Sequence, residues 1–185
     1  MRLPIAKYGN PVLRAKGKRV AASDERIRAL AADMIETMHA ANGVGLAAQQ
    51  VGEALQLTVL DISEVEDRPS TLKMNGVEID PRVAMPLILL NPELSLEGES
   101  VSATEGCLSF PEINGEIERA AVVRAKVETL DGETIEMEAT GLLARALQHE
   151  VDHLNGILFI DRMSSVAKAS LASRLKRLQK ETLAS

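Results

Sequence analysis

Two histidines lie four residues apart in an otherwise apolar stretch, in the segment His149-Glu150-Val151-Asp152-His153. On a helix, residues four apart share a face, so both imidazoles can reach a single cation. Glu150 is displaced by about 100° around the helix axis and can move a proton beside that cation instead of binding it. Polar groups on an apolar helix face need partners, so the pattern predicts a metal-binding helix at the centre of the fold.

The single cysteine, Cys107, is the best candidate for a third ligand. Catalytic metal sites usually combine three protein ligands with one open position. No histidine or cysteine follows His153, so the third histidine of the extended zinc-endopeptidase pattern is missing. Taken alone, Cys107 is more typical of a small buried apolar residue, but a histidine pair without a third ligand favours coordination. Two imidazoles and a thiolate suit Zn²⁺ or Fe²⁺, and ligand softness does not choose between them.

A glycine-rich segment at residues 43–52 begins Gly43-Val44-Gly45 and contains Gln50. It lacks the Lys-Ser/Thr pair of a P-loop and the glycine spacing of a dinucleotide-binding loop. Closely spaced glycines still indicate tight backbone that is open to a ligand, and the Gln50 amide could donate to a developing oxyanion. The alternative interpretation is a helix stop followed by a turn.

The remaining pattern predicts an α+β fold in which mostly antiparallel sheets pack around the central helix. Thr140 is expected to cap that helix, and Asn155-Gly156 to end it. An apolar stripe predicts an earlier helix, with Ser23 as its N-cap and Asn42-Gly43 as its stop. Alternating and apolar runs predict the strands, with a hairpin at Asp131-Gly132, over residues 55–60, 86–96, 122–130 and 135–139.

Two segments complete the expected organisation. Residues 64–84 are polar and lack a period, so we expect a long surface loop there. The tail, residues 164–185, has an apolar stripe and a net charge of +4. The whole chain carries −6, so residues 1–163 carry −10. It should form an amphipathic basic helix on a single catalytic domain of residues 1–163. Its basic face is either solvated or an anchor for ribosomal RNA.

Composition indicates the cellular compartment in which the protein acts and excludes some classes of binding partner. A lone cysteine cannot form an internal disulfide, which favours a reducing, cytoplasmic setting. The first residues show no secretory signal, and the longest apolar run is too short to cross a bilayer. The net charge of −6 argues against broad binding to DNA or other nucleic acid.

Three motifs together resemble the peptide deformylase family. They are Gly43-Val44-Gly45-Leu46-Ala47-Ala48-Gln49-Gln50, Glu105-Gly106-Cys107-Leu108-Ser109, and residues 149–156, which continue from the histidine pair through Leu154-Asn155-Gly156. Their order and spacing match that family, and the resemblance covers roughly residues 3–163. It implies a metal-dependent hydrolase that removes the N-formyl group from the formylmethionine of new polypeptides and releases formate. Such co-translational N-terminal processing takes nascent formylmethionyl peptides as substrate.

The resemblance also implies roles for individual residues. Cys107, His149 and His153 would bind one divalent metal, which we expect to be Fe²⁺, with Zn²⁺, Ni²⁺ or Co²⁺ as alternatives. Glu150 would be the acid/base, while Gln50 and the backbone N–H of Leu108 would stabilise the oxyanion. The substrate's main chain would pair with Gly45, and its methionine side chain would lie against Val44, Leu142 and Ala146. Many family members carry an arginine shortly after the cysteine motif, and residues 110–115 hold none.

Two other functions remain open from the sequence. A zinc endopeptidase could use the same helix, but Cys107 would then be idle. A binding module with a structural metal would need a fourth protein ligand. His39 is the candidate, although a histidine near a helix C-terminus is more typical of a surface residue favoured by the helix dipole.

Overall fold

The first long helix positions one wall of the molecule. The computed structural model describes residues 1–22 and 24–185, so the N-cap expected at Ser23 lies outside the described residues. Helix α1 (Glu25–Ala40) begins after Asp24, whose side chain accepts a hydrogen bond from the backbone N–H of Arg26 at 2.8 Å. The helix ends as expected before Asn42, which takes a positive φ of 56°.

The described strands form one seven-stranded sheet, and every neighbouring pair is antiparallel. The order across the sheet is β1-β2-β5-β6-β7-β3-β4. The bounds are β1 Gly45–Ala47, β2 Leu57–Leu60, β3 Ser70–Met74, β4 Val77–Ile79, β5 Leu87–Cys107, β6 Phe110–Glu128 and β7 Thr134–Thr140. The predicted α+β class with an antiparallel sheet is therefore confirmed.

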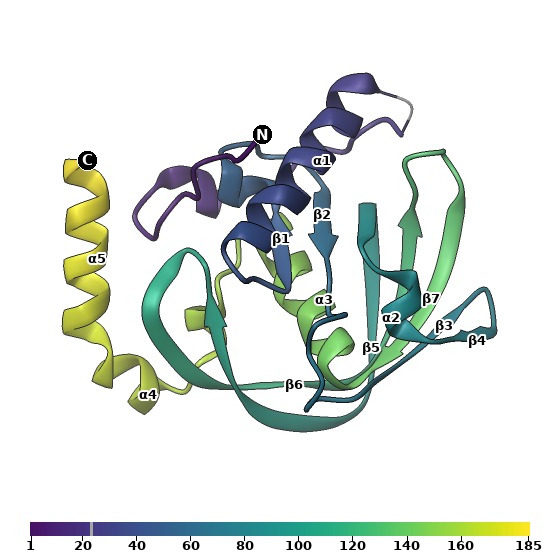
Figure 1. Cartoon of the computed structure of the whole chain (residues 1–185). Coiled ribbons are helices and arrows are strands. Elements are labelled where there is room, and N and C mark those ends of the chain that lie inside the picture. Colours follow the sequence, from purple (N-terminus) through teal and green to yellow (C-terminus); the bar gives the residue numbers. More distant parts are fainter. Residues whose placement is uncertain (23) are drawn as a thin grey trace.

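Helix α3 (Gly141–Leu154) lies in the middle of the molecule and contacts strands β1, β2, β3, β5, β6 and β7. Figure 1 shows the strands curving around it, with α1 above and the C-terminal helix at one side. Its apolar face is fully buried, with Leu143, Leu147 and Leu154 at 0% exposure. The histidines of the sequence pattern are thus carried by the central helix of the fold.

Strands β5 and β6 form one long hairpin, and the turn between them contains Leu108 and Ser109. This hairpin continues well beyond the strand expected at residues 86–96. Its far end carries Cys107 to the side of α3, where Cys107 pairs in register with Phe110. Hairpin pairing over this length therefore places the candidate cysteine ligand against the candidate histidine ligands.

The prediction of a surface loop at residues 64–84 is wrong. The segment contains β3, β4 and a short helix, α2 (Pro81–Ala84). Asn75 and Gly76 both take positive φ, 49° and 80°, which is the backbone that a two-residue hairpin turn requires. β3 pairs with β7 and buries Leu72 at 0% exposure, so this hairpin extends the sheet.

The tail folds onto the body of the protein as two helices, α4 (Ser165–Ser170) and α5 (Ala172–Ala184). The expected single helix is broken at Leu171. Leu171 and Leu175 are 8% and 6% exposed and pack in a cluster with Leu13, Phe110 and Phe159. Short 3-10 segments at Pro11–Arg14, Ala48–Val51 and Phe159–Arg162 complete the chain. No helix in the described residues has the length and apolar character that crossing a membrane requires.

Candidate metal centre

Three side chains from two elements converge on one point. Cys107 comes from the end of β5, and His149 and His153 come from successive turns of α3. One ligand atom from each lies within 4.8 Å of the other two. The Cys107 Sγ and His153 Nε2 atoms are 3.3 Å apart. The two imidazole rings stand edge to face, with centroids 5.1 Å apart, so they can present their nitrogens to a shared cation.

Glu105 fixes the orientation of His149. The His149 Nδ1 atom lies 3.0 Å from Glu105 Oε1, which leaves Nε2 for a metal. Arg119 donates to both Glu105 oxygens at 2.6 and 2.9 Å, and Arg145 donates to Oε2 at 2.8 Å. Burial alone would raise the pKa of Glu105, but the hydrogen bonds from His149 and Arg119 outweigh it and lower the pKa to about 2.

The electrostatics of the two histidines suit a cation. Burial lowers the pKa of His153 well below its usual value, so its imidazole is neutral, the form that ligates metals. Burial acts in the same direction on His149, but hydrogen bonds to Cys107 and Glu105 raise its pKa to about 10. Negative groups around His149 therefore favour positive charge at the point where the ligand atoms meet. A divalent ion fits this donor set of two imidazoles and a thiolate.

Glu150 lies beside the ligands without a partner for one of its oxygens. It is 4% exposed, and its Oε2 atom is buried with no hydrogen bond to any described residue. Burial raises the pKa of Glu150 to about 7. A carboxyl group whose pKa lies near neutrality can both accept and return a proton.

Gly45 allows the strand β1 to lie directly against Glu150. A Cβ atom at position 45 would come within 2.6 Å of Glu150 Oε1 and 2.9 Å of its Cδ. Val44 and Leu46 direct their carbonyls toward β2, where they accept from Asp61 N and Thr58 Oγ1 at 2.8 and 2.9 Å. Because neighbouring residues of a strand point their backbone groups to opposite edges, those of Gly45 face away from β2.

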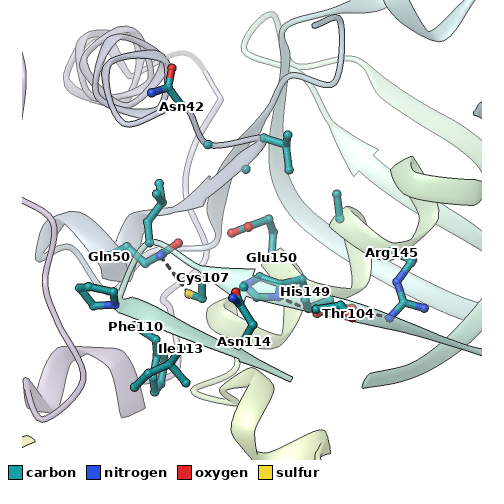
Figure 2. Close-up of a pocket in the computed structure, with 18 of the residues that line it drawn as sticks. Asn42, Gln50, Thr104, Cys107, Phe110, Ile113, Asn114, Arg145, His149 and Glu150 are labelled. Carbon is teal, nitrogen blue, oxygen red and sulfur yellow. Dashed lines mark hydrogen bonds and ion pairs between the residues drawn. The ribbon is translucent and has the colours of Figure 1, made fainter. Parts of the chain in front are cut away.

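Gln50 presents its amide nitrogen to the metal ligands. Its Oε1 accepts from Ala47 N at 3.0 Å, which fixes the amide so that Nε2 faces Ser109 Oγ at 3.1 Å and Cys107 Sγ at 3.6 Å. Leu108 follows Cys107 in the turn between β5 and β6. Figure 2 shows Gln50, Cys107, His149 and Glu150 gathered in one region of the cavity, with the Gln50–Cys107 contact dashed.

A cavity of about 540 Å³ opens over these residues. Val44, Gly45, Leu142 and Ala146, which the sequence analysis assigned to substrate binding, all line it. The residues that line the cavity also include Gly43, Thr104 and Glu105. The cavity therefore joins the candidate metal ligands to a mixed apolar and polar wall formed by β1 and α3.

His39 is not part of this centre. Its Nε2 lies 2.8 Å from Asp61 Oδ2, its side chain is 51% exposed, and it is absent from the group of possible metal ligands among the described residues. The structural-metal hypothesis loses its fourth ligand. The sequence analysis also missed Glu105, Arg119 and Arg145, although Glu105 stands in the cysteine motif and an acidic residue there could have been considered as a partner for a histidine ligand.

Comparisons of the sequence and of the structure with known proteins all find deformylases. The family model for polypeptide deformylase matches residues 2–169. A peptide deformylase of Opitutus terrae is 41% identical over 186 residues, which cover 100% of this chain and 96% of the relative. Among solved structures, a plant peptide deformylase superposes with a TM-score of 0.83 at 34% identity, covering 97% of this chain and 90% of that one. The enzyme of Thermus thermophilus superposes with a TM-score of 0.80 at 36% identity, covering 97% and 99%.

Proposed function

The chain belongs to the polypeptide deformylase family, and on that premise we propose which of its residues perform the hydrolysis. The family reaction removes the formyl group from N-terminal formylmethionine and releases formate. The observation that carries our proposal is the convergence of Cys107, His149 and His153 next to the buried, unpartnered carboxylate oxygen of Glu150. Because Cys107 lies among the candidate ligands, this arrangement favours a deformylase over a zinc endopeptidase that would leave Cys107 idle.

Cys107, His149 and His153 would hold the metal, and Glu105 would keep the His149 ring in the ligating orientation. A metal ion bound here supplies Lewis acidity, which makes water a better nucleophile and polarises the formyl carbonyl. Three protein ligands leave one position free for this purpose.

Glu150 moves the proton in this scheme. Its carboxylate takes a proton from the attacking water and delivers it to the departing amine nitrogen, so that the C–N bond breaks to give formate and a free α-amine. The charge that develops on the formyl oxygen is met by the Gln50 side-chain N–H and the Leu108 backbone N–H. Donation from Ala47 N to Gln50 Oε1 holds the amide in place for this task before the substrate arrives.

The substrate's main chain would run along the free edge of β1. β1 is the terminal strand of the sheet, and the Gly45 backbone groups face away from β2, its only partner strand among the described residues. An extended peptide that pairs there directs its methionine side chain into the wall formed by Val44, Leu142 and Ala146. Apolar contact with that wall would give the preference for methionine.

The test is formate release from formyl-Met-Ala-Ala, measured together with metal content. Replacing Cys107, His149 or His153 with Ala should abolish both. Full turnover with stoichiometric metal in any one variant would remove that residue from the ligand set. Cleavage of unformylated peptides by the wild type would favour the endopeptidase instead.

Fe²⁺ is our proposal for the metal in the cell. A thiolate and Fe²⁺ that are open to substrate are both open to oxidation. Anaerobic purification should yield iron-loaded enzyme that loses activity in air, while Ni²⁺- or Co²⁺-loaded enzyme should be more durable. Iron-loaded enzyme that kept full activity through long aerobic storage would argue against this assignment.

We further propose that the protein acts in the cytoplasm on nascent chains, with the tail as a contact to the ribosome. Its basic residues are exposed while its apolar stripe is packed, so the charged face is free for phosphate. Changing Lys176 and Arg177 to Gln should weaken salt-sensitive cosedimentation with ribosomes and leave turnover of small peptides unchanged. Equal cosedimentation of both proteins at low salt would leave the tail as packing alone.

A further inference from the structure

Arg68 lines the cavity and has no ion pair or hydrogen bond with any described residue. The other two long cations of the lining are engaged. Lys7 donates to the Leu108 carbonyl at 3.0 Å. Arg145 donates to Glu105 and to the carbonyls of Val101 and Ile117 at 2.6–2.8 Å. Arg68 is therefore the cation in this wall that remains available for a ligand.

The backbone that directly follows Arg68 is held against the start of α3. Leu142 N donates to Pro69 O at 3.4 Å, and Leu143 N donates to Ser70 Oγ at 2.9 Å. Gly141 permits this close approach, because a Cβ atom there would overlap the Pro69 backbone. The exposed Arg68 side chain thus starts from a fixed point beside Leu142.

Arg68 also lies near Arg145, which marks that end of the cavity. Burial lowers the pKa of Arg145, and the neighbouring positive charge of Arg68 contributes in the same direction. In Figure 2, Arg145 is well separated from Phe110 and Gln50, which line the opposite end. Leu142 and His149 are seven residues apart on α3, which corresponds to about 10 Å along the helix axis. The backbone beside Arg68 therefore lies about this far along α3 from the candidate metal ligands.

The geometry of an extended substrate brings its third residue to this point. Alternate side chains of an extended chain point to the same side, and two residues span about 7 Å. With the methionine side chain against Leu142 and Ala146, the second side chain points away from α3 and the third returns to it. This step rests on the proposed function, which places the main chain along β1. We propose that Arg68 is a specificity-determining residue that binds an acidic side chain at the third position of the formylated peptide.

The experiment compares matched peptides that differ in one charge. Formate release is measured with formyl-Met-Ala-Glu-amide against formyl-Met-Ala-Gln-amide, and with the same exchange at the second position. The terminal amides remove the competing α-carboxylate. The holoenzymes are the wild type, Arg68→Gln, and a control, Arg82→Gln, which changes an exposed arginine of the same segment, residues 64–84, that does not line the cavity.

In wild type and in Arg82→Gln, kcat/KM should be about two- to five-fold higher for Glu than for Gln at the third position, as for a solvent-exposed ion pair. In Arg68→Gln that ratio should fall to about one, and rising salt should lower it in the wild type. An unchanged ratio in Arg68→Gln, a larger preference at the second position, or no preference in the wild type would each overturn the assignment. Failure of the wild type to deformylate any of the peptides would instead overturn the proposed function itself.

Discussion

Gly45→Ala is the substitution whose effect can be worked out most directly from the structure. The added Cβ atom would lie 2.6 Å from Glu150 Oε1 and 2.9 Å from both Cδ and Cγ. Non-bonded carbon atoms prefer separations of about 3.5–4.0 Å, so the carboxylate has to retreat by about 1 Å. Glu150 is 4% exposed, so its carboxylate would have to move within the site and away from its present place beside the metal ligands.

A displacement of about 1 Å at a catalytic group can cost roughly 100-fold in rate. We therefore expect kcat/KM to fall about 100-fold, which corresponds to about 2.7 kcal/mol of lost transition-state stabilisation. Metal content should stay stoichiometric, because the three atoms nearest to the new methyl group all belong to Glu150 and not to a metal ligand. The overpacking should also lower the free energy of unfolding by about 1–3 kcal/mol.

The assay is formate release from formyl-Met-Ala-Ala, with metal content and thermal unfolding measured on the same samples. Gly115→Ala is the matched control, because the atoms nearest to its Cβ belong to the flexible end of Met163 and not to Glu150. It should lower stability without a comparable loss of turnover. If Gly45→Ala kept kcat/KM within about three-fold of wild type while holding its metal, close approach of β1 to Glu150 would not matter for catalysis.

Three other changes test separate parts of the structure. Glu150→Gln should keep its metal but lose about 100- to 10,000-fold in kcat, since it removes proton transfer alone, and loss of metal in this variant would contradict that role. Leu175→Ala should lower the free energy of unfolding by about 2–5 kcal/mol in a denaturant titration, because the side chain is 6% exposed, and a change below about 0.5 kcal/mol would show that the tail is not anchored there. Burial alone would raise the pKa of Asp161, but hydrogen bonds from Arg14 and the Leu158 N–H lower it below 3.8. The folded state therefore binds fewer protons than the unfolded state, and the Arg14–Asp161 pair stabilises the folded state above that pH. The stability deficit of Asp161→Asn, roughly 0.5–1 kcal/mol for a partly exposed pair, should therefore be present at pH 7 and disappear as pH falls through the lowered folded-state pKa. A deficit that grew toward acid would refute this sign.

The local part of the candidate site could be predicted from the sequence. The spacing of His149 and His153 is a property of one helix, and the chain offers a single cysteine, so the ligand set needed no knowledge of the tertiary fold. The partners of Glu105 could not be found this way. Arg119 reaches Glu105 across the β5–β6 hairpin, and Arg145 reaches it from α3, so these contacts depend on pairing between distant segments.

The difference between local patterns and contacts between distant segments also explains which parts of the fold were predicted wrongly from the sequence. The hairpin of β3 and β4 carried a readable signal in Asn75-Gly76, but its strands are short and Leu72 is the only fully buried side chain in them. Residues 97–102 of β5 are exposed throughout, so no alternation of polar and apolar side chains marks that part of the strand. Its extent is set by the register with β6, which a single-sequence pattern does not contain.

If the substrate pairs along β1 as proposed, the open edge of this strand imposes a timing constraint on the reaction. Only a chain that is still extended over its first residues can lie along a three-residue edge strand. A formylated N-terminus that has already entered a helix or a sheet has its backbone groups occupied and cannot pair there. Deformylation thus competes with the earliest folding of each new polypeptide. Proteins whose first strand or helix forms quickly should keep their formyl group more often when the enzyme is scarce.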